Sequence, residues 1–143
     1  MSKITVTKCF DICYGHQLPG HDGACKNWHG HNSRIEVTFR SFTKHELLER
    51  PLLSVNIYPS MVVDFKDIKK HVKPVVMQLD HKNLNEVFGT TDNNLKLNAP
   101  TAENIAEFLW NEINEISKEE LPAVLTKLRV SETPDSWAEI TED

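Results

Sequence analysis

The feature that most constrains this chain is an alternation of apolar and polar residues at every second position from residue 3 to residue 16. Lys8 is the single interruption. Successive side chains of a strand point to opposite faces, so a period of two predicts a strand with one buried face. The buried positions are mostly large and apolar, and the series ends on a histidine: Ile4, Val6, Phe10, Ile12, Tyr14 and His16.

Three further strands are predicted from the same kind of pattern. A second alternation covers residues 29–40, and residues 137–140 are predicted as the last strand. Between these two lies a third strand, with Leu128, Val130 and Glu132 on one face. In the second strand the apolar face is formed by the odd positions: His29, His31, Ile35, Val37 and Phe39.

Two helices are expected between the second and third strands. Asp64 is a typical N-cap residue for the first helix, which Pro74 is expected to kink or end early. Thr101 and Glu103 open the second helix, which carries an apolar stripe at helical spacing. We interpret residues 43–60 as a connection that contains short extended pieces.

Grouped strands and helices indicate the fold class. The order ββααββ predicts an α+β fold, with two helices on one face of a four-stranded antiparallel sheet. The chain has 143 residues, which corresponds to one domain over residues 1–143.

Charge, hydropathy and cysteine content exclude several classes of protein. The net charge of −5 argues against a dedicated nucleic-acid binder, and the apolar runs are too short for a transmembrane helix. We therefore expect neither a nucleic acid nor a membrane as a partner. The N-terminus lacks a signal-peptide core, and an odd count of three cysteines favours a reducing, cytoplasmic location. Cys9 and Cys13 alternate on the first strand and are interpreted as structural.

The histidines are concentrated in one short segment. Four of the seven fall between residues 16 and 31. His29 and His31 are two residues apart, so on a strand they point to the same side, and His16 comes near them if the first two strands pair. Three neutral imidazoles with one open position are typical of a catalytic zinc site. A single histidine is more often an ordinary core or surface residue. Here all three would lie on the same face of two paired strands, which favours a metal site. His21 is expected to face solvent.

Three other side chains are candidates for chemistry. Cys25 lies four residues before His29, and it is either a fourth ligand of a closed structural site or a base or nucleophile beside the metal. Asp80 precedes His81 and is able to orient its ring, although such pairs also occur in solvated turns. Glu132 is a carboxylate on an apolar strand face, where burial without a partner is costly, unless it lies at a solvated strand end.

Together these residues resemble the 6-pyruvoyltetrahydropterin synthase superfamily. The matching segments run in family order over nearly the whole chain: His16, 25–31, 63–65, 79–85, 100–104 and 132–133. The three residues between Cys25 and His29 look like those of bacterial 6-carboxytetrahydropterin synthases of queuosine synthesis. Pyruvoyl-forming members usually have a longer spacer, and a third branch has glutamate in place of the cysteine.

The resemblance implies a fold, an assembly and a metal. The fold would be the tunnelling fold (T-fold), in which subunits close their sheets into a barrel, usually as a homohexamer built from a dimer of trimers. One zinc ion per subunit would be held by His16, His29 and His31.

The resemblance also implies a reaction and residue roles. The activity would be that of a lyase converting 7,8-dihydroneopterin triphosphate to 6-carboxy-5,6,7,8-tetrahydropterin, acetaldehyde and triphosphate. Cys25 would be the proton-transferring base, and Asp80 with His81 the relay on the other side. Glu132 would anchor the pterin in a pocket shared between subunits, since a carboxylate accepts two parallel N–H groups. Thr101 or Glu103 would assist Glu132.

Two alternatives remain open. One is a 6-pyruvoyltetrahydropterin synthase, which eliminates triphosphate but retains the side chain. The other is a non-catalytic zinc-binding or pterin-binding module, which would be expected to lack one of the candidate catalytic residues; this chain has all four: Cys25, Asp80, His81 and Glu132.

Overall fold

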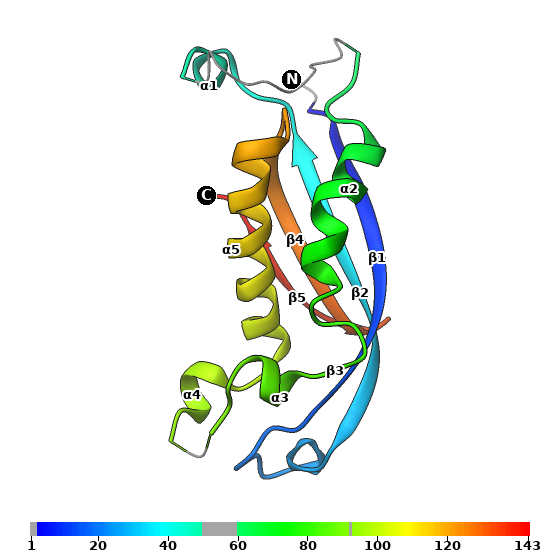
Figure 1. The fold of residues 1–143 in the computed structure, drawn as a ribbon, viewed down its shortest axis with the longest axis vertical. Coiled ribbons are helices and arrows are strands. Elements are labelled where there is room, and N and C mark those ends of the chain that lie inside the picture. The colour runs from blue at the N-terminus through cyan, green and yellow to red at the C-terminus, as the bar shows by residue number, and fades with distance from the viewer. Residues whose placement is uncertain (1–2, 50–59, 92) are drawn as a thin grey trace.

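The computed structural model describes residues 3–49, 60–91 and 93–143. Its centre is a sheet with the strand order β3-β1-β2-β4-β5, and helices cover one face of this sheet (Figure 1). The strands are β1 Thr5–His16, β2 His29–Arg40, β3 Lys82–Asn83, β4 Val124–Thr133 and β5 Ser136–Thr141. The α+β class is therefore confirmed.

The sheet differs from the prediction in one strand. Strands β1, β2, β4 and β5 pair antiparallel in the expected way. The two-residue strand β3 adds a parallel pairing to Tyr14 and Gly15 of β1, so the sheet is mixed and five-stranded rather than four-stranded and antiparallel. A strand of two residues has no periodicity, which is why the alternation of the sequence does not reveal it.

The alternation in β1 and β2 determines where the core lies. These strands pair without a shift from Thr5 opposite Arg40 to His16 opposite His29. The even side of β1 and the odd side of β2 therefore share one face, which packs under the helices. The largest fully buried side chains of the strands lie on this face: Ile12, Ile35, Phe39, Leu125 and Leu128.

Helix α2, Phe65–Val76, begins where the sequence predicts. The Asp64 carboxylate accepts the backbone N–H of Lys66 at 2.8 Å. The expected early end at Pro74 is wrong, because the helix continues to Val76. Pro74 lies in the last turn, where its missing N–H removes a single helical bond, and the N–H of Met77 still reaches the carbonyl oxygen of Lys73 at 2.9 Å.

Helix α5, Ala102–Glu120, begins after Thr101, whose hydroxyl accepts the N–H of Asn104 at 3.1 Å. It packs on β4 and on α2 through its buried stripe of Ile105, Leu109 and Ile113. No helix in the described parts of the chain is both long and apolar enough to span a bilayer.

Short helical segments complete the fold: the 3-10 turn η1 Ala24–Lys26, α1 Lys44–Leu48, α3 Leu84–Val87 and α4 Leu95–Asn98. Helix α1 replaces part of the predicted extended connection, because Thr43 and Glu46 form a reciprocal capping box. The rest of that connection, residues 50–59, lies outside the described residues.

Candidate active site

Three histidines meet at the end of the sheet that extends beyond α2 and α5 (Figure 1). His16 pairs directly with His29, and His31 follows two residues later on the same face. The ring centroids lie 4.4 Å apart for His16 and His29, and 5.0 Å apart for each of the other two pairs. One nitrogen of each ring lies within 4.8 Å of the others, so the predicted cluster forms.

The hydrogen bonds of two of these rings define their tautomers. His16 Nδ1 lies 2.7 Å from the carbonyl oxygen of Pro100, and His29 Nδ1 lies 2.8 Å from that of Asn27. A carbonyl only accepts, so each Nδ1 carries the hydrogen and each Nε2 keeps a free lone pair. Burial lowers the pKa of His16, which favours the neutral ring that a metal requires.

The cluster also contains unsatisfied polar atoms. The Nε2 atoms of His16 and His31 are buried and have no hydrogen-bond partner among the described residues. Buried polar atoms nearly always have a partner, so a missing one requires an explanation. A divalent cation bound by three imidazole nitrogens would satisfy them, and it would retain an open position for a further ligand. The residues therefore fit a metal such as zinc.

Glu132, near the end of β4, lies beside this cluster. Its Oε1 atom is 3.9 Å from Nε2 of His16 and 3.9 Å from Nε2 of His31. The side chain is 29% exposed, which is neither a solvated strand end nor full burial. Its negative charge would stabilise a cation held by the histidines.

Tyr14, which the alternation of β1 predicts only as a core residue, belongs to the site. Its ring contacts those of His16 and His31, with centroids 5.3 Å and 5.8 Å apart. The hydroxyl is buried, and burial together with Glu132 raises the pKa of the phenol, an effect that the neighbouring Ser33 hydroxyl opposes. Its position two residues before His16, on the same face, is the sequence signal that points to this role.

Cys25 lies in the turn η1, on the loop between β1 and β2. Its thiol is half-buried and unpaired, and it does not belong to the group of donor atoms that the three histidines form. Its backbone carbonyl accepts the N–H of Leu18 at 2.7 Å, which holds the loop together. His21, on the same loop, is exposed as expected.

Asp80 and His81 form a dyad away from the three histidines. Asp80 Oδ2 lies 2.9 Å from His81 Nδ1, and Asp80 Oδ1 accepts the backbone N–H of Cys13 at 2.9 Å. That bond from Cys13 is the main reason why the pKa of Asp80 is lowered. His81 has a positive φ of 58° and donates its own N–H to the carbonyl oxygen of Cys13 at 2.6 Å. The dyad is thereby fixed to the edge of β1.

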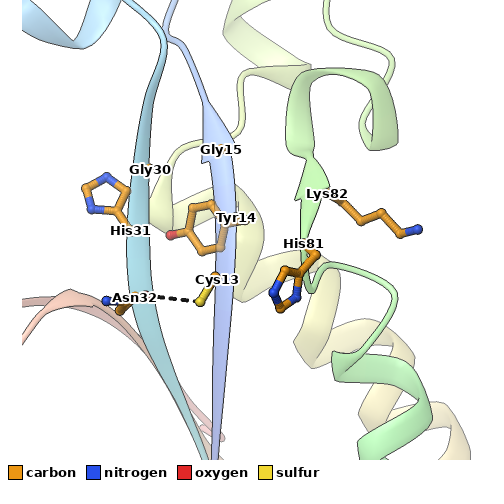
Figure 2. Close-up of a pocket in the computed structure, with 8 residues that line it drawn as sticks. All are labelled: Cys13, Tyr14, Gly15, Gly30, His31, Asn32, His81 and Lys82. Carbon is orange, nitrogen blue, oxygen red and sulfur yellow. Dashed lines mark hydrogen bonds between the residues drawn. The ribbon is translucent and has the colours of Figure 1, made fainter.

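A cavity of about 350 Å³ lies at this edge (Figure 2). Figure 2 shows Cys13 joined to Asn32 across the two strands, with His81 on the other side of β1 from Asn32. The cavity is lined by Cys13, Tyr14, Gly15, Gly30, His31, Asn32, His81 and Lys82. Its lining thus includes one histidine of the cluster and the histidine of the dyad.

The remaining two predicted residues lie at the start of α5. Thr101 uses its hydroxyl as the helix cap, and Glu103 is exposed in the first turn. The bond from His16 to Pro100 brings this segment next to the histidine cluster.

Comparison with known proteins agrees with this geometry. Residues 5–143 match the family model described as 6-pyruvoyl tetrahydropterin synthase. The 6-carboxy-5,6,7,8-tetrahydropterin synthase of Haemophilus influenzae is 30% identical, over 99% of this chain and 100% of that protein. The protein of the same name from Synechocystis is 34% identical, over 77% of this chain and 74% of that protein.

Solved structures show the same fold. The 6-pyruvoyl tetrahydropterin synthase of Caenorhabditis elegans superposes with a TM-score of 0.73 at 25% identity, covering 100% of this chain and 98% of that one. The Plasmodium falciparum protein of that name has a TM-score of 0.67 at 17% identity, over 99% of both chains, and is similar in fold alone. The fold is the predicted tunnelling fold, and the chain belongs to the 6-pyruvoyl tetrahydropterin synthase family.

Proposed function

We propose that this protein is a zinc-dependent lyase that converts 7,8-dihydroneopterin triphosphate and water to 6-carboxy-5,6,7,8-tetrahydropterin, acetaldehyde and triphosphate. In the cell this would be an early step of queuosine biosynthesis. The observation that carries the proposal is the cluster of three histidines with two buried, unpartnered Nε2 atoms, in a chain of this family. The proposal includes a cytoplasmic location, which the odd number of three cysteines favours.

His16, His29 and His31 would hold the zinc ion. When bound, zinc supplies a Lewis acid that polarises hydroxyl groups on the substrate side chain. The carbonyl oxygens of Pro100 and Asn27 orient two of the rings, so that both present Nε2 rather than Nδ1. This arrangement prepares the site before any ligand arrives.

Cys25 and the dyad of Asp80 and His81 would move the protons. The reaction transfers protons at neighbouring carbons, which requires a base and an acid on different sides of the substrate. Asp80 orients the ring of His81 through Nδ1 and leaves Nε2 free for proton exchange. Cys25, on the loop next to His29, would act on the opposite side.

We further propose that the complete pocket is shared between subunits of a hexamer. Within one chain, the dyad and the histidine cluster are two separate groups of donor atoms. A second subunit would bring its own dyad or its own loop to the cluster. The free edge of β5 and most of the edge of β1 are unpaired among the described residues, which supports association through the sheet edges.

Glu132 would anchor the pterin through its carboxylate, with Thr101 or Glu103 of the adjacent segment. The 3.9 Å distances from Glu132 to two histidines support a position inside the site. A carboxylate there would accept paired N–H groups of the pterin ring.

One experiment tests the proposal. The zinc-loaded protein is incubated with 7,8-dihydroneopterin triphosphate, and the products are identified by mass. Acetaldehyde and 6-carboxy-5,6,7,8-tetrahydropterin support the proposal. A pterin that has lost triphosphate but keeps all the carbons of its side chain would identify the second candidate, a 6-pyruvoyltetrahydropterin synthase. The 29% identical relative from Poecilia reticulata is named 6-pyruvoyl tetrahydrobiopterin synthase. Binding without turnover would indicate the non-catalytic module.

A further inference from the structure

A second group of potential metal ligands lies outside the three-histidine cluster. Cys13, Asp80 and His81 each offer a donor atom within 4.8 Å of the other two. Cys13 is at an odd position of β1 and His16 at an even one, so the two side chains leave the strand on opposite faces. We propose that Cys13, Asp80 and His81 form a second site, for a thiophilic divalent cation such as Zn²⁺.

The group is held together before any cation binds. The N–H of Cys13 donates to Asp80, and the N–H of His81 donates to the carbonyl of Cys13, so two bonds fix the dyad to β1. Asp80 Oδ2 and His81 Nδ1 are 2.9 Å apart. Ligands at 2.0–2.1 Å around a tetrahedral zinc ion are separated by about 3.3 Å. The pair needs to open by only a few tenths of an ångström, with the ring hydrogen moved to Nε2.

Charge and protons balance at this site. A thiolate, a carboxylate and a neutral imidazole carry a total charge of −2, which matches a divalent cation. The thiol of Cys13 now donates to Asn32 Oδ1 at 3.0 Å. When the cation binds, the thiol proton passes to solvent, and the Asn32 amide is able to rotate and donate its NH₂ to the thiolate.

Within a single chain, the site is open to solvent. The side chain of His81 is 79% exposed and that of Asp80 is 24% exposed, and the cavity lined by Cys13 and His81 leaves room for a water ligand. In Figure 2 the ammonium group of Lys82 extends away from His81, so it does not occupy the cation position. Because of this exposure, we expect weaker binding than at the three histidines.

Occupation of the second site would have a consequence for catalysis. The cation would use the lone pairs of Asp80 and His81, so excess metal would withdraw the dyad from proton transfer. This consequence rests on the proposed function, whereas the metal binding itself does not.

The test is a titration of the metal-free protein with Cd²⁺, whose thiolate complexes absorb in the ultraviolet. We expect two ions per chain and one thiolate band. Cys13→Ser should remove the band and the weaker ion. Cys9→Ser, an exposed thiol on the same face of β1, and Cys25→Ser should retain both.

Two further variants distinguish the two sites and leave the sequence of β1 unchanged. His81→Asn tolerates the left-handed backbone but lacks the imidazole, and it should lose the weaker ion. His31→Ala should lose the tighter ion and keep the thiolate band. A single ion per chain in the wild type would overturn the proposal. A thiolate band that persists in Cys13→Ser, or that disappears in Cys25→Ser, would also overturn the proposal.

Discussion

The imidazole of His16 donates its Nδ1 hydrogen to the carbonyl oxygen of Pro100, 2.7 Å away and 84 residues later in the chain. This bond joins the end of β1 to the segment that precedes α5. It also turns Nε2 of His16 toward the other two histidines. The backbone of one element thereby fixes which ring nitrogen of a side chain on another element carries the hydrogen.

The first prediction concerns the metal. His31→Ala removes one of three nitrogen ligands, so the tightly bound zinc ion, measured after dialysis without added metal so that the weaker second site is empty, should be lost. Turnover should fall by more than the roughly 10–100-fold loss typical of residues that only orient a metal ligand. Zinc content is measured by elemental analysis. The matched control is His21→Ala, because His21 is exposed on the loop and outside the cluster. Retention of the tightly bound zinc ion by His31→Ala would reject the three-histidine site.

The second prediction separates a base from a ligand at Cys25. Cys25→Ala should keep full zinc, since three histidines remain, while turnover falls by about 10²–10⁴. Both quantities are measured on one preparation, with Cys9→Ala as the control. Joint loss of zinc and stability would instead identify Cys25 as a structural ligand. Normal turnover with full zinc would exclude both roles.

The third prediction concerns the carboxylate beside the histidines. Glu132→Gln keeps the size of the side chain but removes the charge that accepts the pterin N–H groups, so pterin affinity should fall about tenfold or more. Zinc content should not change. Glu112→Gln, on the exposed face of α5, is the control. Affinity is measured by calorimetry, and normal binding by Glu132→Gln would place the anchor elsewhere.

The fourth prediction concerns stability. Arg40 donates to both Glu46 and Glu142, at distances of 2.6–3.1 Å, and the pKa of Glu142 is lowered chiefly by its bond from Arg40. Arg40→Ala should lower the free energy of unfolding by about 2 kcal/mol, because it removes the charged hydrogen bonds that the guanidinium donates to two partly buried carboxylates. Arg34→Ala is the control and should change stability far less, since solvent screens its exposed pair with Asp11. Equal effects of the two substitutions in urea unfolding would contradict the prediction.

The ion pairs of Arg40 with Glu46 and Glu142 also predict that the stability of the fold depends on pH. A carboxylate whose folded pKa is lowered stabilises the fold above its unfolded pKa, about 4.5 for glutamate, and loses this contribution as pH falls through the folded value. The difference in urea midpoint between wild type and Glu142→Gln should therefore be full at pH 7 and shrink at acidic pH. A difference that stays constant across this range would argue against the ion pair with Arg40 as its cause.

The fifth prediction concerns assembly. We expect sedimentation velocity at micromolar concentration to show six chains per particle, because unpaired sheet edges are normally covered and the proposed pocket takes its dyad and its histidine cluster from different chains. Glu139→Pro in β5 should weaken the assembly if this edge is used. A stable monomer that retains activity would reject the shared pocket.

Much of the fold was predictable from local patterns. The alternation in residues 3–16 and 29–40 determined which face of each strand is buried, and Asp64 and Thr101 both cap helices as expected. The end of α2 was not predictable from Pro74, because the effect of a proline depends on how many helical bonds remain after it. Strand β3 depends on a tertiary contact with β1 and has no local signature.

The site was predictable to a smaller extent. The alternation in the two strands was enough to predict that His16, His29 and His31 lie together, because the pairing of β1 with β2 relates all three residues. The separation of Asp80 and His81 from that cluster depends on how the turn after α2 meets the edge of β1, which no periodicity encodes. The contact of Cys13 with the dyad likewise arises only when residues 67 positions apart fold together.

The uninterrupted pairing of β1 with β2 limits how this hairpin can change in length during evolution. Inserting one residue into either strand would exchange the faces of every residue beyond it, which would expose the core and turn the histidines away from one another. The loop of residues 17–28 is under no such constraint. A change in the length of this loop would therefore move the thiol of Cys25 relative to a substrate, while the three imidazoles stay where the strands hold them.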